Sequence, residues 1–572
     1  MCGIVGILSK DLINKKDSFL INRMIDEVSY RGPDGKKIIK NNKFITACVR
    51  LAIVDPVERS DIPFETKQFI FSFNGEIYNY KILKKKLKKN YKFITESDTE
   101  VFARAFEEWG LKCFKKLSGM YACSIYDKKK QKLYLVRDEF GMKPLYYFLK
   151  NKKIFFSSEI KSFQHIVKLR LNKNNIKNWL YLNHIEDSST MIDNCNKVEP
   201  GTILIFDKNF KKKKINLYKL EETFKNSNKF NQNKIEQILK KQTEQHTVDI
   251  RTQSAVLLSG GLDSSLLAAL IKKKYGKQSN NFYSLSCKIN FPGLNEEEDI
   301  KNVLRQIKIK NYSLNLNKDN FFEHFNRCSK RFDFPIFHPS LVALDMIISQ
   351  KKMKNSKVLY VGDGSDEIFL GYDWFSPEFY KNLPDISTRG LLDLIGVKSN
   401  KFIENSLKIK KQNSNLGFMK KINKLNTESK IRYINQKIYL TKFLFSRDKI
   451  GMKRSMEIRV PFCNKEILSE INKINSKHLL DKIILKQIAK KYLKQSNFSR
   501  KKIGFTIPIR SWMTKEIIER YLRQINFKCI KYYNHTFIKK ILNEHYSGEV
   551  DHIRFIWNII SFELWAKHYF KK

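Results

Sequence analysis

The chain has 572 residues, of which 42% are hydrophobic and 13% aromatic, enough to build two or three domains with complete cores. No apolar run approaches the ~18 residues of a membrane-spanning helix, and the first short apolar run soon reaches charged residues, so we expect neither a membrane protein nor a secretory signal. The net charge of +51 would suit nucleic-acid binding, but scattered lysine runs without a nucleic-acid-binding motif indicate no such partner.

Cysteine usage bears on the cellular compartment. Nine cysteines are scattered along the chain, their number is odd, and none forms a C-x-x-C pair. This pattern favours neither a disulfide framework nor a zinc site, and it is typical of a reducing compartment. We therefore expect a cytoplasmic protein.

The first seven residues are MCGIVGI, with a cysteine at position 2 before an apolar run. Removal of Met1 would leave Cys2 with a thiol and a free α-amine on one residue. An ordinary buried thiol at the start of a first strand is the alternative interpretation. The heptad alone does not decide between the two.

Residues 1 to about 205 predict short β-strands joined by turns and a few helices. The runs typical of strands are FITACVRLAIVD, QFIFSFNGEIY, YACSIYD, KLYLVRD and KIFFSSE. The stretch SDTEVFARAFEEWG predicts a helix with an apolar stripe. Ser97 would cap this helix, Glu100 would complete a capping box, and Gly110 would end it in the left-handed conformation.

The polar, lysine-rich stretch 206–234 predicts a linker between a first domain at 2–205 and a second at 235–572. Beyond it, SAVLLS, NFYSLSCKI and SKVLYVGDG predict buried strands, and SSLLAALIKKKYG predicts a helix. Alternating strands and helices are typical of an α/β domain with a parallel sheet. The tail beyond about residue 380 is predicted to be mostly helical.

The segment LLSGGLDSS, residues 257–265, predicts a phosphate-binding loop between a strand and a helix. Its glycines let backbone N–H groups approach an anion, and the serine hydroxyls and the helix N-terminus add donors and positive charge. It lacks the ending of a Walker A loop and resembles the pyrophosphate loop of ATP pyrophosphatases. Asp263 would repel phosphate unless a cation lay between them, which indicates Mg²⁺. A glycine turn capped by serine is the alternative.

A second acidic loop, VGDGSDEIFLGY at 361–372, follows a strand of the same domain. Its Asp363, Asp366 and Glu367 would lie at the carboxyl end of that strand, where α/β domains bind ligands. Alone the loop could be a solvated turn. Together with the phosphate loop, it favours Mg²⁺ ligation and substrate handling.

These motifs together resemble the glutamine-dependent asparagine synthetase family over almost the whole chain. The motifs that resemble its class II glutamine amidotransferase domain are MCGIVGI, RGPDG, RLAIVD, NGEIYN, ESDTE and RDEFGMKPLYY. Those that resemble its synthetase domain are LSGGLDSS, GDGSDE, SMEIRVPF and KKIGFTIPIRSW. The resemblance implies an α+β, Ntn-hydrolase-type first domain of stacked antiparallel sheets with helices, followed by an α/β synthetase domain with a parallel sheet and a helical tail.

The resemblance implies that Cys2 is the nucleophile that hydrolyses glutamine. Its α-amine, with a pKa of about 7.7–8.0, would be the base. The Asn74 side chain and the Gly75 N–H would form the oxyanion hole. Arg50 would hold the glutamine carboxylate as a bidentate pair, and Asp98 its α-ammonium. The other pocket residues implied are Leu51, Ala52, Ile53, Val54 and Glu76.

In the second half the resemblance implies a site for ATP and Mg²⁺. Asp263 and Asp366 would hold the metal, Lys482 would stabilise charge during adenylation, and Asp363 would lie near the activated acceptor. The implied ATP-binding residues are Leu258, Ser259, Gly260, Gly261, Asp263, Ser264, Cys287, Val361 and Gly362.

The activity implied is glutamine-hydrolysing asparagine synthesis, in which ATP, L-aspartate and glutamine give AMP, pyrophosphate, asparagine and glutamate through β-aspartyl-AMP and channelled ammonia. Two departures from the family bear on the acceptor: Asp363 stands where well-studied bacterial members carry glutamate, and VPFCNKE lacks the usual Leu-Asp after Phe462. One alternative is a related amidotransferase for a sugar-acid or cell-wall carboxylate. Another is a glutaminase with a decayed second half, which the intact SGGLDSS loop argues against. The expected partners are small-molecule substrates, and a homodimer is left open.

Overall fold

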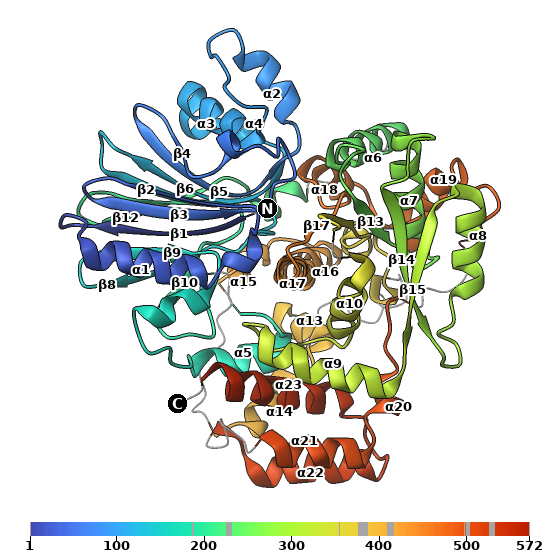
Figure 1. Cartoon of the computed structure of the whole chain (residues 1–572). Coiled ribbons are helices and arrows are strands. Elements are labelled where there is room, and N and C mark those ends of the chain that lie inside the picture. The colour runs from blue at the N-terminus through green and yellow to red at the C-terminus, as the bar shows by residue number, and fades with distance from the viewer. Residues whose placement is uncertain are drawn as a thin grey trace.

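The chain folds into two regions that differ in sheet type (Figure 1). The computed structural model describes residues 2–185, 188–224, 231–353, 355–375, 387–408, 417–496, 498, 504–525 and 532–570. The first region contains two antiparallel sheets, and the second contains a parallel sheet among helices. This confirms the expected order of an α+β region and an α/β region. No helix among the described residues is long and apolar enough to cross a membrane.

Two six-stranded sheets stack in the first region, in the orders β10-β8-β9-β1-β3-β2 and β12-β11-β7-β6-β5-β4. The strands are β1 (Cys2–Ser9), β2 (Gly35–Lys40), β3 (Phe44–Arg50), β4 (Phe64–Glu65), β5 (Phe69–Ile77), β6 (Gly119–Asp127), β7 (Lys132–Arg137), β8 (Tyr146–Lys150), β9 (Lys153–Ser157), β10 (Cys195–Lys197), β11 (Thr202–Phe206) and β12 (Lys212–Asn216). Outside the sheets lie α1 (Lys15–Asp26), α2 (Tyr80–Leu87), α3 (Asp98–Trp109), α4 (Cys113–Lys116) and α5 (Asn174–Leu182) (Figure 1).

The alternation of side chains along β1 explains its apolar sequence. Ile4 and Leu8 belong to the cluster between the two sheets, whereas Ile7 packs with the apolar face of α1. Successive side chains of a strand point to opposite faces, so both faces of β1 are buried. Gly6 is required by close packing, because a Cβ there would lie 2.1 Å from the ring of Phe156.

Helix α3 forms where it is expected, and Ser97 caps it by accepting a hydrogen bond from the Thr99 N–H. The predicted capping box is wrong. The Glu100 carboxylate instead accepts hydrogen bonds from the backbone N–H and hydroxyl of Thr95, at 2.8 and 2.7 Å, because the preceding loop folds back over the first turn. Gly110 ends the helix with φ +53° and ψ −138°, so its φ is positive but it lies outside the left-handed helical region.

The predicted linker at 206–234 contains a strand. Residues 212–216 form β12, which pairs with β11 and is the edge of the second sheet. Lys212, Lys213 and Lys214 are exposed on it, and lysines on an edge strand oppose pairing with another chain. Lysine richness was therefore a poor indicator of a linker here. The first region continues past residue 205.

The parallel sheet of the second region has the order β15-β14-β13-β16-β17. Its strands are β13 (Ser254–Leu257), β14 (Phe282–Ile289), β15 (Lys310–Leu316), β16 (Val358–Tyr360) and β17 (Glu457–Arg459). Its helices are α6 (Gln232–His246), α7 (Leu262–Tyr275), α8 (Glu297–Ile307), α9 (Lys318–Arg331), α10 (Ser340–Ile348), α11 (Ser365–Phe369), α13 (Thr388–Ile395), α14 (Asn400–Ser406), α15 (Met419–Ile422), α16 (Thr427–Ile434), α17 (Thr441–Met452), α18 (Lys465–Ile471), α19 (Ile483–Lys490), α20 (Ile509–Trp512), α21 (Lys515–Ile525), α22 (His535–Tyr546) and α23 (Ile553–Tyr569).

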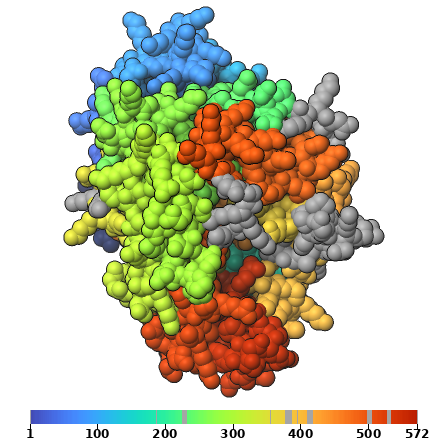
Figure 2. Space-filling view, turned by 90° about the vertical axis from the view of Figure 1, so that its right-hand side faces the viewer, coloured from blue at the N-terminus to red at the C-terminus, as the bar shows by residue number. Residues whose placement is uncertain are grey.

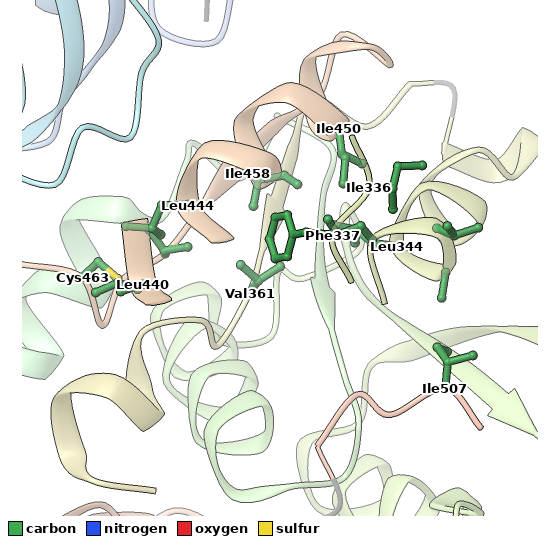
Figure 3. Close-up of a cluster of buried hydrophobic side chains, with 14 of the residues drawn as sticks. Ile336, Phe337, Leu344, Val361, Leu440, Leu444, Ile450, Ile458, Cys463 and Ile507 are labelled. Atoms are coloured by element: carbon green, nitrogen blue, oxygen red, sulfur yellow. The ribbon is translucent and has the colours of Figure 1, made fainter. Parts of the chain in front are cut away.

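One strand of this sheet, β17, comes from the tail that was expected to be helical. A π-helical segment, η8 (Asn435–Leu440), leads into α17, and β17 follows it. In Figure 3, Val361 after β16 and Ile458 of β17 lie in one apolar cluster with Leu444 and Ile450 of α17. This packing attaches α17 to the carboxyl ends of the strands, where the acidic loop begins. Residues 501–503, part of the KKIGFTIPIRSW motif, lie outside the described residues.

Candidate active sites

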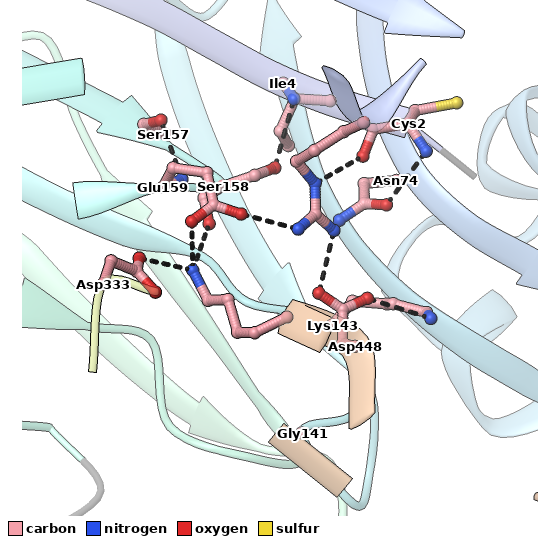
Figure 4. Close-up of polar contacts among 12 residues, drawn as sticks. Cys2, Ile4, Asn74, Gly141, Lys143, Ser157, Ser158, Glu159, Asp333 and Asp448 are labelled. Carbon is pink, nitrogen blue, oxygen red and sulfur yellow. Dashed lines mark hydrogen bonds and ion pairs between the residues drawn. The ribbon is translucent and has the colours of Figure 1, made fainter. Parts of the chain in front are cut away.

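Cys2 lies where the two antiparallel sheets meet the second region. It is the first residue of β1 and pairs with Arg50 at the end of β3. Its backbone nitrogen donates a hydrogen bond of 3.2 Å to Asn74 Oδ1 of β5, in the other sheet. Figure 4 shows this contact, and Figure 1 places the N-terminus at the end of the sheets that faces the parallel sheet. Register and stacking thus bring together three residues that are far apart in sequence.

The environment of the Cys2 thiol favours its protonated form. Burial raises its pKa, and the Leu51 N–H and the Arg50 charge oppose this only in part. A thiol in this state needs a base before it can attack a carbon. This requirement fits the predicted role of the α-amine as the base. Only a residue at the N-terminus carries a free α-amine.

A buried donor lies beside Cys2 without a partner. Asn74 is fully buried, and its Nδ2 makes no hydrogen bond to any described residue. A buried unsatisfied donor costs about 1–3 kcal/mol, so its retention points to a ligand. Gly75 follows it, and a Cβ there would lie 2.2 Å from the carbonyl oxygen of Met120. The oxyanion-hole role of Asn74 and Gly75 stays a prediction, which the Nδ2 of Asn74, free of any described partner, fits.

Two buried carboxylates lie near Cys2. Asp98, at the start of α3, accepts a hydrogen bond of 2.9 Å from the Ile77 N–H, and burial raises its pKa to about 6. Glu76 pairs with Arg459 at 3.1 Å, and burial raises its pKa to about 8 despite that cation. Arg459 belongs to β17 of the parallel sheet, so the second region forms part of the pocket wall. The sequence analysis missed this residue, although the quoted SMEIRVPF motif contains it.

Arg50 is held by the loop that follows it. Its guanidinium donates to the carbonyl oxygens of Val54, Asp55 and Val57, at 3.0, 2.6 and 2.8 Å, and pairs with Asp61 at 3.0 Å. Its role toward the glutamine carboxylate stays a prediction. The rest of the predicted pocket segment runs directly after β3, with Leu51, Ala52 and Ile53 buried and Val54 partly buried.

The pH dependence of glutamine binding can test the role of Asp98. The carboxylate must be ionised to hold an α-ammonium, so the KM for glutamine should rise about tenfold per pH unit below pH 6. Initial glutaminase rates across this range measure the effect. Asp98→Asn should raise the KM at every pH and remove the dependence, whereas Asp26→Asn, at an exposed acid, should behave like the native protein. A KM that stays constant through pH 6 would remove Asp98 from the site.

The predicted phosphate loop joins β13 to α7 at the carboxyl end of the parallel sheet. Ser259 Oγ and Ser264 Oγ are 3.1 Å apart, and the Gly261 N–H donates to Ser259 Oγ at 3.3 Å. Gly260 has φ +75°, and a Cβ there would lie 2.7 Å from Asp299 Cβ. The glycine therefore allows both the turn and the close approach of α8.

The predicted adenosine-pocket residues come from three neighbouring strands. Leu258 follows β13, Cys287 is in β14, and Val361 and Gly362 follow β16. Burial raises the pKa of the Cys287 thiol to about 12, which opposes formation of a reactive thiolate; its place in an ATP pocket stays a prediction. The phosphate loop and the acidic loop are in contact, since a Cβ at Gly362 would lie 3.0 Å from Asp263 Cβ.

Lys482 joins the two predicted metal ligands. Its Nζ lies 2.5 Å from Asp263 Oδ2 and 2.5 Å from Asp366 Oδ1, so both carboxylates surround one cation. Burial opposes the charge, but the two carboxylates raise the pKa of Lys482 above its ordinary value. Gly371 makes room for this arrangement, because a Cβ there would lie 2.0 Å from Lys482 Cε. Two carboxylates that share an ammonium ion are also placed to share Mg²⁺.

Asp363 has a partner that the sequence analysis did not identify. Arg447 of α17 donates from Nε and Nη2 to the two oxygens of Asp363, at 2.5 and 3.2 Å. Arg447 is 7% exposed, and its Nη1 makes no hydrogen bond to a described residue. The available signal was the charged triplet Arg447-Asp448-Lys449 within a predicted helix, since buried charges need partners.

A buried ion network links the surroundings of Cys2 to the second region (Figure 4). Arg31 donates to the Cys2 carbonyl oxygen at 3.1 Å and pairs with Glu159 at 2.6 Å and with Asp448 of α17 at 2.9 Å. The charged members are Arg31, Lys143, Glu159, Asp333, Asp448 and Lys449. Helix α17 therefore contacts the surroundings of both sites. Its Asp448 pairs with Arg31 beside Cys2, and its Arg447 pairs with Asp363.

A separate polar group has the composition of a metal site but not its electrostatics. The ligand atoms of His324, Cys328 and Asp345 lie within 4.8 Å of one another. However, Asp345 already pairs with His324 at 2.6 Å and with Arg331, and Arg454 lies 3.6 Å away. The two arginines neutralise the carboxylate, so the group is a buried polar cluster around an ion pair. Eight cysteines are free, and Cys529 lies outside the described residues.

Comparisons with known proteins cover both regions. The family model of a glutamine amidotransferase domain matches residues 1–218, and that of asparagine synthase matches residues 234–567. Glutamine-hydrolyzing asparagine synthetase 1 of Bacillus subtilis is 27% identical over 99% of this chain and 96% of its own length. Putative glutamine-hydrolyzing asparagine synthetase 2 of Methanocaldococcus jannaschii is 30% identical over 67% of this chain and 79% of its own. The chain therefore belongs to the asparagine synthase family, whose members are ATP-dependent ligases that hydrolyse glutamine.

Proposed function

We propose that this chain transfers ammonia from glutamine to a carboxylic acid activated by ATP, with L-aspartate as the first candidate acceptor. The observation that carries the proposal is the meeting of the phosphate loop and the acidic loop on Lys482, at the carboxyl end of the parallel sheet. That assembly is what adenylation requires, and a decayed second half would not retain it. A cytoplasmic location is part of the proposal and is supported by the free cysteines.

In the first site, the α-amine of a processed Cys2 would take the proton of its own thiol. Sγ would then attack the amide carbon of glutamine, and the oxyanion would accept hydrogen bonds from Asn74 Nδ2 and the Gly75 N–H. Each such donor is worth roughly 3–4 kcal/mol in comparable sites. Ammonia leaves as the C–N bond breaks, and water hydrolyses the thioester to give glutamate. Asn74 Nδ2, which makes no hydrogen bond to a described residue, supports this assignment.

In the second site, the loop from Ser259 to Ser264 would hold the phosphates of ATP through backbone N–H groups and hydroxyls. Asp263 and Asp366 fit Mg²⁺, since their oxygens already share one cation. Bound Mg²⁺ would neutralise and orient the phosphates. Lys482, which lies beside both carboxylates, would stabilise negative charge on the substrate.

One contact favours a second class of acid as the acceptor of ammonia. The two departures from the family pattern touch each other: Cys463 Sγ lies 3.6 Å from the carbonyl oxygen of Asp363, and a Cβ at Gly364 would lie 2.2 Å from that sulfur. Changes at both positions thus alter one wall of the acceptor site. A sugar-acid or cell-wall carboxylate is the alternative acceptor that such a change would suit.

The acceptor can be identified by supplying ATP, Mg²⁺ and glutamine with single carboxylic acids and measuring release of AMP and pyrophosphate. Aspartate should give both products together with asparagine. If aspartate is inactive and another acid is active, the acceptor is reassigned and the reaction type stands. If no acid releases AMP while glutamine is still hydrolysed, the proposed ligase function is wrong.

The Asp363–Arg447 pair provides a test of acceptor activation. Asp363→Asn should lower ligation about 10²-fold, because the two-pronged contact that orients the carboxylate is lost. Glutaminase activity should be unaffected, so glutamate would accumulate without AMP. Arg447→Lys should give a partial loss, since lysine keeps the charge but not the fork geometry. Asp249→Asn, at an exposed aspartate, is the control, and undiminished ligation by Asp363→Asn would contradict the role.

A further inference from the structure

A cavity of about 120 Å³ lies in the second region, next to the acidic loop. Its walls include Asn183 after α5, Tyr439 of η8, Lys442 of α17, and Arg554 and Asn558 of α23. Figure 2 shows a hollow on this face of the molecule, with teal and dark-red atoms, the colours of the chain near α5 and in α23, at its floor.

The cavity shares its wall with the residues that surround Asp363. The ring of Phe443, which lines the cavity, lies 5.6 Å from the Arg447 guanidinium that holds Asp363. Tyr439 lies on the same wall, and its ring centroid is 6.0 Å from that of Tyr372 in the acidic loop. The cavity therefore lies beside the side chains that pack against Arg447 and the acidic loop.

The described acidic and basic side chains that line the cavity are all basic, with Lys442 and Arg554 as the two that carry the argument. Lys442 Nζ lies 4.0 Å from the centroid of the Tyr439 ring and donates to the Leu182 carbonyl oxygen at 3.3 Å. Neither Lys442 nor Arg554 forms an ion pair with a described residue, and the described lining contains no carboxylate. Burial, followed by the charge of Arg554, lowers the pKa of Lys442 to about 7. An anion between the two side chains would reverse that shift.

A third lining residue has an unmet acceptor. Asn558 is 2% exposed, and its Oδ1 makes no hydrogen bond to a described residue. A buried acceptor of this kind needs a donor, which an ammonium or hydroxyl group of a ligand would supply. The cavity thus offers two cations for an anionic group and one acceptor for a neighbouring donor.

We propose that Lys442 and Arg554 bind a second anionic group of the acceptor acid, a carboxylate or a phosphate, while Asn558 accepts from an ammonium or hydroxyl group beside it. This inference rests on the proposed ligase function and adds the chemical class of its acceptor. It makes Lys442 and Arg554 specificity-determining residues. It also predicts that acids with a single anionic group are poor substrates.

The test compares matched pairs of acids that differ in the second anionic group. L-aspartate is compared with β-alanine, and 6-phosphogluconate with gluconate, with ammonium salt as nitrogen donor and AMP release as the readout. The dianionic member of at least one pair should have a kcat/KM about 10- to 100-fold higher, the range expected for a charge-assisted hydrogen bond. The pair that shows this difference distinguishes a carboxylate from a phosphate.

Variants then assign the effect to the cavity. Lys442→Met and Arg554→Gln should remove most of that preference through KM for the acid, and Arg554→Lys should keep much of it. Glutamine hydrolysis reports correct folding, and Arg554 is exposed, so its variant should fold normally. Lys437→Met, at a lysine that lines a different cavity, is the matched control.

Three outcomes would contradict the inference. Equal use of both members of each pair by the native enzyme, with AMP released, would refute it while leaving the proposed function intact. A preference that survives in Lys442→Met and Arg554→Gln would place the anion elsewhere. AMP release with no acid at all would overturn the proposed function, and this inference with it.

Discussion

Cys2→Ala is expected to lower glutamine-dependent synthesis by at least about 10³-fold, while synthesis from ammonium salt continues. The substitution removes the nucleophile but leaves the backbone hydrogen bond from residue 2 to Asn74 and the whole second region in place. The measurements are glutamate release and AMP release, each with glutamine and with ammonium as the nitrogen source. Loss of the first with retention of the second would locate glutamine hydrolysis at Cys2.

Cys113→Ala is the matched control, because Cys113 is also a buried thiol of the first region but lies in α4. It should keep glutamine-dependent synthesis. Glutamine hydrolysis by Cys2→Ala at a tenth of the native rate would show that another group is the nucleophile. Loss of ammonium-dependent activity in Cys2→Ala would show instead that the substitution disturbs the second region through the Arg31 network.

Asp263→Asn is expected to reduce AMP and pyrophosphate formation at least about 10²-fold, whichever nitrogen source is supplied. An amide at this position cannot share a cation with Asp366 as a carboxylate does, and Lys482 would lose one of its two counter-charges. Glutamine hydrolysis should persist, because Cys2 and its pocket lie in the other region. Raising the Mg²⁺ concentration should restore part of the activity if metal affinity is what was lost.

The control for this experiment is Asp299→Asn, at an acid of α8 near the phosphate loop that has no predicted metal role. It should release AMP at close to the native rate. Native AMP release by Asp263→Asn would remove Asp263 from the metal site. Simultaneous loss of glutamine hydrolysis would indicate that the substitution acts on the fold rather than on the second site.

Much of the local structure was determined by short stretches of sequence. The alternation of apolar residues predicted the strands around Cys2 and Asn74, and the apolar stripe after Ser97 predicted α3. The strand, two glycines and helix at 257–265 predicted the phosphate loop. These features depend on hydrogen bonds and side-chain periodicity between residues close together in the chain, and the residues alone specify them.

Other features were decided by the tertiary structure. Glu100 bonds to Thr95 instead of closing a capping box, because the preceding loop folds over the helix. Residues 212–216 join a sheet because β11 leaves them an edge to pair with. Neither outcome can be read from the local pattern, since each depends on where a neighbouring segment lies.

The sites show the same division. Sequence motifs indicated Cys2 and Asp363, but the partners that set their chemistry come from distant segments. Arg459 reaches Glu76 in the glutamine pocket, and Arg447 holds Asp363. A buried charge is stable only beside an opposite charge or a hydrogen-bonding group, and packing of whole sheets and helices decides which one that is. The sequence by itself therefore indicated the candidate reacting groups, and the tertiary structure decided their partners, because local periodicity carries no information about contacts between residues hundreds of positions apart.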